Sequence, residues 1–144
     1  MTRPPPPDIV LLATDWQPRT LIRAQLIEEG FEVAATDSWP MMQRYFGSDP
    51  IPQLAIVDLQ GLPDPSSVLD DLRGLMKPER VLVLMAMATI SKADLERLGF
   101  HVLARPFAIE EITRSAANLG AVGHGSRDHR GQSRAPASRS QGER

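Results

Sequence analysis

Five short apolar runs, separated by segments with helical spacing, constrain the fold of this chain more than any other feature. The runs lie at residues 8–12, 31–35, 54–57, 81–86 and 101–104. They are continuous rather than alternating, which is typical of strands buried on both faces. No hairpin turn joins any two of them, so the strands are expected to be parallel. The sequence therefore predicts an α/β fold, a doubly wound five-stranded parallel sheet with helices on both faces.

The segments between the runs carry signals for helix starts and stops. The expected helices cover residues 18–29, 38–46, 64–76, 91–99 and 108–118. Ser38, Asp64 and Ser91 are each expected to cap a helix, because a short polar side chain accepts a hydrogen bond from a free N–H in the first turn. Gly30 is expected to end the first helix, since glycine tolerates the left-handed conformation of a helix stop.

The composition is that of an ordinary globular domain. The 144 residues, 42% of them hydrophobic and 24% charged, are enough for one domain with a sizeable core. The absence of cysteine excludes disulfides and thiolate sites. The longest uncharged apolar stretch, residues 81–90, is about half of the roughly 20 residues that a membrane span needs. We expect a cytoplasmic protein that does not contact membranes.

The formal net charge of −2 is unevenly distributed. Five arginines against two carboxylates give residues 121–144 a charge of +3, which leaves about −5 on the rest of the chain. An acidic body argues against specific nucleic-acid binding, because such folds concentrate positive charge on one face. We expect a proline-rich leader at residues 1–7, a folded domain at residues 8–120, and a disordered basic Gly/Ser/Arg tail.

Two of the apolar runs end in a charged group. The third run leads into Asp58 and the fifth leads into Arg105. The carboxyl ends of parallel strands face one crevice, which is where open α/β sheets bind ligands. Asp58 is therefore expected either to carry chemistry there or to bind nearby backbone amides or Arg105. The chain lacks the glycine-rich phosphate loops and the nucleophile elbow of common α/β enzymes, and we do not expect an enzyme.

From residue 8 to about 118 the sequence resembles the receiver domain of bacterial response regulators. The resemblance rests on the strand and helix order and on three motifs: Glu29-Gly30-Phe31-Glu32-Val33, Val57-Asp58-Leu59 followed by Pro63, and Arg105-Pro106-Phe107. It implies a flavodoxin-like sheet with strand order 2-1-3-4-5. It also implies that Asp58 stands at the phosphoacceptor position and Arg105 at the position of a phosphate-binding lysine.

The residues depart from the receiver pattern at most positions that the implied chemistry needs. In receiver domains an acidic pair holds Mg²⁺ with the acceptor aspartate, and a hydroxyl after the fourth strand binds the phosphoryl oxygens. Ala13 and Thr14 stand at the acidic pair, and Met85 stands at the hydroxyl. Asp15 is one position beyond the pair, so any metal site would use Asp15 and Asp58. We therefore expect no cofactor, or weakly bound Mg²⁺.

These departures predict a degenerate, stand-alone receiver, or pseudo-receiver. Losing one preorganised electrostatic donor costs about 10²–10³ in rate, and several are missing here. The expected function is bacterial signal transduction through contact with a protein, such as a histidine kinase or another signalling protein, without phosphorylation. Two alternatives stay open: a phosphorelay receiver phosphorylated on Asp58, and a remnant domain whose basic tail docks to an acidic partner. The expected contact surface is residues 91–118.

Overall fold

The computed structural model describes residues 6–47, 49–86 and 90–120. The expected tail at 121–144 and the first five residues of the leader lie outside the described residues. Within the described ranges, no helix combines the length and apolar character needed to cross a membrane.

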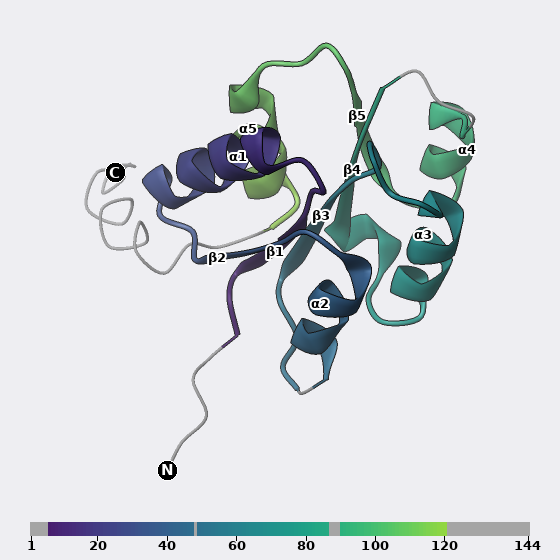
Figure 1. Ribbon diagram of the computed structural model, residues 1–144, viewed down its shortest axis with the longest axis horizontal. Helices are drawn as coiled ribbons and strands as arrows, with labels where there is room; N and C mark the ends of the chain where they lie inside the picture. Colours follow the sequence, from purple (N-terminus) through teal and green to yellow (C-terminus); the bar gives the residue numbers. More distant parts are fainter. Residues whose placement is uncertain (1–5, 48, 87–89, 121–144) are drawn as a thin grey trace, which may run out of the picture.

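A five-stranded parallel sheet forms the centre of the fold (Figure 1). The strands are β1 (Ile9–Leu12), β2 (Val33–Thr36), β3 (Leu54–Asp58), β4 (Val81–Met85) and β5 (His101–Ala104). Their order is β2-β1-β3-β4-β5, and every neighbouring pair is parallel. The expected doubly wound sheet and its strand order are confirmed.

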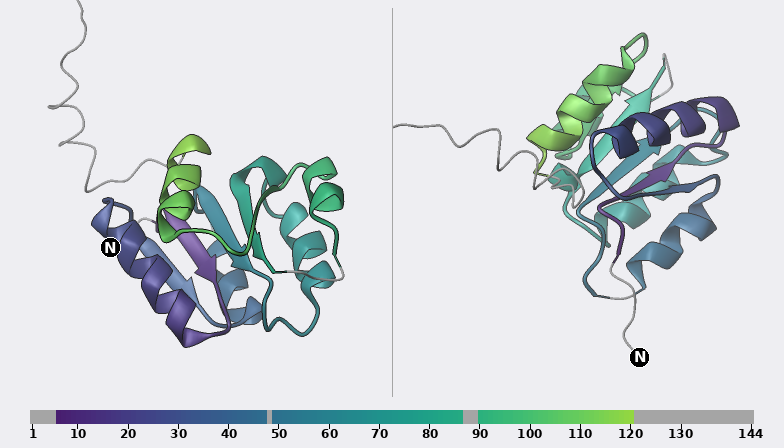
Figure 2. Two further views of the ribbon diagram at one scale, coloured as in Figure 1. Left: turned by 90° about the horizontal axis from the view of Figure 1, so that it is seen from above. Right: turned by 90° about the vertical axis from the view of Figure 1, so that its left-hand side faces the viewer.

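Helices cover both faces of this sheet, as Figures 1 and 2 show. The α-helices are α1 (Trp16–Glu28), α2 (Trp39–Gln43), α3 (Pro65–Arg73), α4 (Lys92–Arg97) and α5 (Ile109–Asn118). Short 3₁₀ turns follow at Arg44–Phe46 and Pro78–Arg80. Helices α1 and α5 lie on one face, and α2, α3 and α4 lie on the other.

Alternate side chains of the strands build two separate hydrophobic clusters, one on each face. In β1, Ile9 and Leu11 pack with α1 and α5, while Val10 and Leu12 pack with α2 and α3. This division follows from the twofold alternation of side chains along a strand. Because both faces are covered, strands β1, β3 and β4 are buried throughout. This burial on both faces explains why the sequences of these strands are continuous apolar runs.

The three expected helix caps are present. The side chain of Ser38 accepts a hydrogen bond from the N–H of Met41, and that of Asp64 accepts one from Ser67. Ser91 does the same at the start of α4. Each of these three helices is the next helix in the chain after a strand: α2 follows β2, α3 follows β3 and α4 follows β4.

The expected strand at 31–35 begins two residues later than the sequence indicates. Gly30 adopts a left-handed φ of 97°, and the N–H of Phe31 donates to the carbonyl of Leu26. Phe31 thus belongs to the stop of α1, and its ring is buried beneath that helix. The helix expected at 64–76 likewise ends early, at Arg73, and continues as a turn.

Candidate functional site

The candidate site lies at the carboxyl edge of the sheet, where β3, β4 and β5 end. Asp58 is the last residue of β3, and Arg105 directly follows β5. The two strands are not neighbours, because β4 lies between them. The backbone holds the three strand ends together: the N–H of Arg105 donates to the carbonyl of Met85, and that of Leu59 donates to the carbonyl of Leu84. Arg105 therefore reaches across the end of β4.

Arg105 binds the carboxylate of Asp58 with both ends of its guanidinium group. Nη1 donates to Oδ1 at 3.1 Å, and Nη2 donates to Oδ2 at 2.7 Å. The backbone N–H of Gln60 also donates to Oδ1, at 3.1 Å. The side chain of Asp58 is 3% exposed and that of Arg105 is 26% exposed. The ring of Phe107 lies 5.2 Å from the guanidinium carbon and flanks the cation.

This arrangement satisfies the buried carboxylate without any further ligand. Paired N–H groups match the two carboxylate oxygens in a planar fork, which is the strongest common geometry for such a pair. A buried charge requires this kind of compensation, since an unpaired carboxylate at this depth would be very costly. Both oxygens through which Asp58 could attack phosphorus or bind a metal already accept hydrogen bonds.

The loop after β1 carries the two residues at the acidic-pair position. Ala13 is buried and has no polar side chain. The hydroxyl of Thr14 donates to the carbonyl of Gln60 at 3.0 Å and so joins the loop after β1 to the loop after β3. Nη1 of Arg19 donates to the carbonyls of Ala13 and Thr14, at 2.8 and 3.1 Å. Both of these backbone carbonyl oxygens thus accept hydrogen bonds from a second guanidinium group, that of Arg19.

The two residues expected to share a metal have different surroundings. Asp15 is exposed at the N-terminus of α1, and its backbone carbonyl accepts a hydrogen bond from Arg19. Asp58, in contrast, is buried and accepts hydrogen bonds from Arg105 and Gln60. Met85 is buried at the end of β4, where its thioether has no proton to donate. Val102, in the neighbouring strand β5, is also buried.

The donor set at this edge does not fit a preformed magnesium site. Mg²⁺ requires oxygen ligands in a near-ideal octahedron, usually including one or two free carboxylates. Here the oxygens of Asp58 accept hydrogen bonds from Arg105 and Gln60, and the carbonyl of Gln60 accepts one from Thr14. No group of three or more candidate ligating side chains occurs within the described ranges.

Sequence reasoning did not identify Arg19 or the bond between Thr14 and Gln60. The available signal was an arginine in the first turns of a helix that starts at the carboxyl edge of the sheet. The two tryptophans of the chain differ in their exposure. Trp16 is 69% exposed, whereas Trp39 packs against the hydrophobic cluster beneath α2 and α3.

Comparison with solved structures finds the same architecture in receiver domains. The receiver domain of NtrX from Brucella abortus is 22% identical over 78% of this chain and 97% of that chain, with a TM-score of 0.66. The receiver domain of the Francisella response regulator 1452 is 21% identical over 78% and 95%, with a TM-score of 0.65. A response regulator receiver protein from Sinorhizobium medicae WSM419 is 18% identical over 77% and 91%, with a TM-score of 0.64.

At the level of sequence, no protein-family model matches the chain, and no curated protein matches it either. The similarity is therefore one of fold. The chain has the fold of response-regulator receiver domains, as the motifs at Asp58 and Arg105 indicate.

Proposed function

We propose that this receiver-fold chain is a signalling module that acts through contact with a protein partner and does not depend on phosphorylation of Asp58. In this proposal the ion pair with Arg105 replaces the phosphoryl group and its metal as the interaction that sets the conformation of the carboxyl edge. The module therefore stays in one signalling state.

The bidentate pair between Asp58 and Arg105 carries the proposal. Phosphoryl transfer to a carboxylate requires a free oxygen nucleophile and charge stabilisation of the transferring group. Asp58 has its oxygens bound, and the positions expected to supply charge and hydroxyl groups hold Ala13, Thr14 and Met85. A guanidinium group in place of a lysine also favours a fixed planar pair over a mobile point charge.

The surface proposed to contact the partner comprises α4, β5 and α5. In α5, Ile112 and Ala116 are buried against the sheet, while Glu110 and Arg114 are exposed. Glu111, in contrast, accepts a hydrogen bond from the N–H of Ala108 at 2.8 Å and helps to start the helix. Glu110 and Arg114 are therefore the charged groups of α5 that we propose for partner contact. A histidine kinase or another signalling protein is the class of partner proposed.

The test is phosphorylation of the purified full chain by acetyl phosphate and Mg²⁺, followed by intact-mass measurement. The control is Asp58→Asn. A second variant restores the receiver pattern through Ala13→Asp, Thr14→Asp, Met85→Thr and Arg105→Lys, and its amide NMR spectrum establishes that it folds. We expect no Asp58-dependent labelling of the natural chain and measurable labelling of the restored variant.

Labelling of the natural chain that disappears in Asp58→Asn would overturn the proposal. It would support the alternative of a phosphorelay receiver whose metal is held by Asp15 and Asp58. The other alternative, docking through the basic tail, concerns residues outside the described ranges and stays a prediction. Partner binding that survives deletion of residues 121–144 would exclude it.

A further inference from the structure

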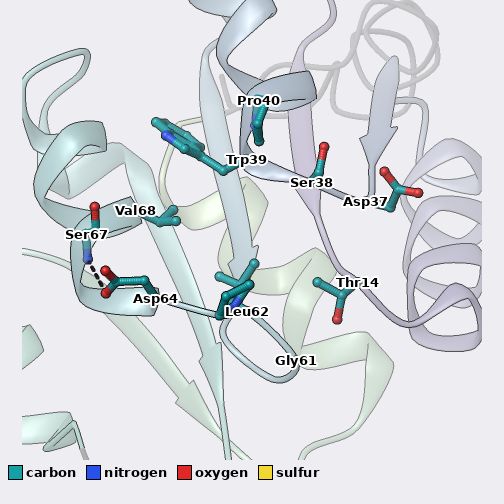
Figure 3. A pocket seen from close by; sticks show the side chains of 11 residues that line it. Thr14, Asp37, Ser38, Trp39, Pro40, Gly61, Leu62, Asp64, Ser67 and Val68 are labelled. Atoms are coloured by element: carbon teal, nitrogen blue, oxygen red, sulfur yellow. Dashed lines mark hydrogen bonds between the residues drawn. The ribbon is translucent and has the colours of Figure 1, made fainter.

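A cavity of about 420 Å³ opens at the carboxyl edge of the sheet, next to the loop after β3 (Figure 3). Its walls come from the loops after β1, β2 and β3 and from the first turns of α2 and α3. The lining residues are Thr14, Asp37, Ser38, Trp39, Pro40, Gly61, Leu62, Pro63, Asp64, Ser67 and Val68. Neither Asp58 nor Arg105 lines it. Any ligand of this cavity is therefore distinct from a phosphoryl group on Asp58.

The cavity occupies the place where this topology favours ligand binding. In the order β2-β1-β3-β4-β5, the chain leaves β1 for β2 on one side and later returns to β3 on the other. At such a switch point the connections after the central strands run to opposite faces of the sheet, which favours a crevice outside the strand ends. Here the loops after β1 and β3 touch, and the cavity opens between this contact and the loop after β2. Thr14 and Gly61 are the lining residues that these two loops contribute next to each other.

Close contacts hold this part of the cavity wall in one conformation. The hydroxyl of Thr14 donates to the carbonyl of Gln60. Gly61, at a left-handed φ of +84°, lies so close that an added Cβ would stand 2.1 Å from Oγ1 of Thr14. Asp64 is fixed by its hydrogen bond from the N–H of Ser67. A preformed wall lowers the ordering cost of binding.

The lining combines an apolar surface with negative charge. Trp39, Leu62 and Val68 all belong to or pack against the hydrophobic cluster of this face. Asp37 and Asp64 lie on opposite sides of the view in Figure 3, with the indole and Leu62 between them. No lysine, arginine or histidine lines the cavity. Within the described part of the chain, no cation forms an ion pair with either carboxylate.

We propose that this cavity binds an organic cation: an amidinium, guanidinium or ammonium group carried on a flat or apolar body. The indole of Trp39 offers a π face, which attracts both an apolar ring and a cation. The two carboxylates favour positive charge and disfavour phosphate or carboxylate ligands. The volume lies within the range of small-molecule sites, roughly 300–1,000 Å³.

Three probes of nearly equal shape separate the contribution of charge from that of apolar packing. Benzamidinium carries a positive charge, benzamide is neutral and benzoate is negative. Each is titrated into the ¹⁵N-labelled full chain. We expect benzamidinium to shift the amides of the lining residues with a dissociation constant on the order of 1 mM, benzamide to bind at least five times more weakly, and benzoate not to bind.

Two charge-removing substitutions test whether the carboxylates are responsible. Asp37→Asn and Asp64→Asn are combined, and asparagine at residue 64 still caps α3 because its side-chain oxygen accepts the same hydrogen bond. The matched control is Asp70→Asn with Asp71→Asn, which changes the net charge equally on exposed positions of α3 outside the cavity. We expect benzamidinium binding to weaken at least fivefold in the first variant and to stay within twofold in the control.

Three results would overturn the proposal. The first is that benzamidinium and benzamide bind equally well, and the second is that both double variants weaken benzamidinium binding to the same extent. The third is that the amides of the lining residues show no saturable shifts at a benzamidinium concentration 20-fold above the expected dissociation constant, roughly 20 mM. A fourth ligand, N-acetyl-phenylalanyl-arginine amide, distinguishes the source of the cation. Tighter binding of this peptide than of benzamidinium indicates an arginine side chain of a protein, and weaker binding indicates a free small molecule; both agree with the proposal.

Discussion

The ion pair between Asp58 and Arg105 predicts a large coupling energy in the folding of this domain. The perturbation is a double-mutant cycle of Asp58→Asn, Arg105→Gln and the two combined. Asp58→Asn keeps the size of the side chain, Arg105→Gln shortens it, and each change removes one charge. The cycle isolates the interaction of the two groups from the effects of each substitution on its own.

The geometry sets the expected size of that coupling. Removing one partner of a fully buried pair costs about 3–5 kcal/mol. Arg105 is 26% exposed, and Asp58 keeps the hydrogen bond from the N–H of Gln60. We therefore expect Arg105→Gln to lower the free energy of unfolding by about 2–3 kcal/mol, with a coupling of about 1.5–2.5 kcal/mol. Arg105→Glu places a second negative charge beside Asp58 and is expected to cost more than Arg105→Gln.

The assay is urea unfolding of the full chain, followed by circular dichroism at low and high salt. The control cycle uses Asp70 and Arg73 on α3, whose side chains are 74% and 42% exposed and whose charged atoms are 4.0 Å apart. That pair is expected to couple by less than about 0.5 kcal/mol and to lose this coupling in 1 M NaCl. The buried pair is expected to keep most of its coupling at high salt.

A coupling of Asp58 and Arg105 no larger than that of the control pair would contradict this prediction. Such a result would mean that solvent, rather than the guanidinium group, satisfies the carboxylate. A coupling that disappears at high salt would contradict the burial on which the magnitude rests.

Two further predictions concern the frame around the site. Gly61→Ala places a methyl group against Oγ1 of Thr14 and puts alanine at a strained φ, so we expect the free energy of unfolding to fall by about 2–3 kcal/mol. Adding Thr14→Ala removes the contact and should recover part of this loss. No recovery in the double variant would contradict the close approach of Gly61 and Thr14. Ile112→Ala removes a fully buried side chain that anchors α5 and is expected to cost about 2–5 kcal/mol. The comparison is Leu98→Ala, at a half-exposed residue, which is expected to lower the free energy of unfolding by less than about 1 kcal/mol. Equal losses in the two variants would contradict the burial of Ile112 beneath α5.

The fold was largely predictable because its signals are local. Continuous apolar runs indicate strands buried on both faces, and Ser38, Asp64 and Ser91 indicate helix starts. The predicted start of the second strand was wrong, because the residue placed there belongs to the end of the preceding helix. Phe31 reads as the beginning of a strand, yet its N–H closes α1. Predicting which strands lie next to Asp58 required the strand order of the sheet. That order was implied by the resemblance to receiver domains and could not be obtained from hydrophobic periodicity.

The candidate site was predictable only in part, because its contacts join residues far apart in sequence. The end positions of β3 and β5 indicated that Asp58 and Arg105 share an edge, but not that the guanidinium group spans the end of β4. The hydrogen bond of Thr14 to Gln60 depends on the close approach of two loops, which no local pattern specifies. The cavity beside Trp39 opens next to this contact.

The most direct test of whether Asp58 can take part in phosphoryl chemistry is an amide NMR titration of the full chain with Mg²⁺ and beryllium fluoride, which mimics a phosphorylated aspartate. We expect that the amides near Asp58, Thr14 and Arg105 do not shift in a saturable manner at millimolar Mg²⁺, because the carboxylate is already bound by the guanidinium group. Saturable shifts centred on these residues, lost in Asp58→Asn, would contradict it and show that the site accepts a phosphoryl group.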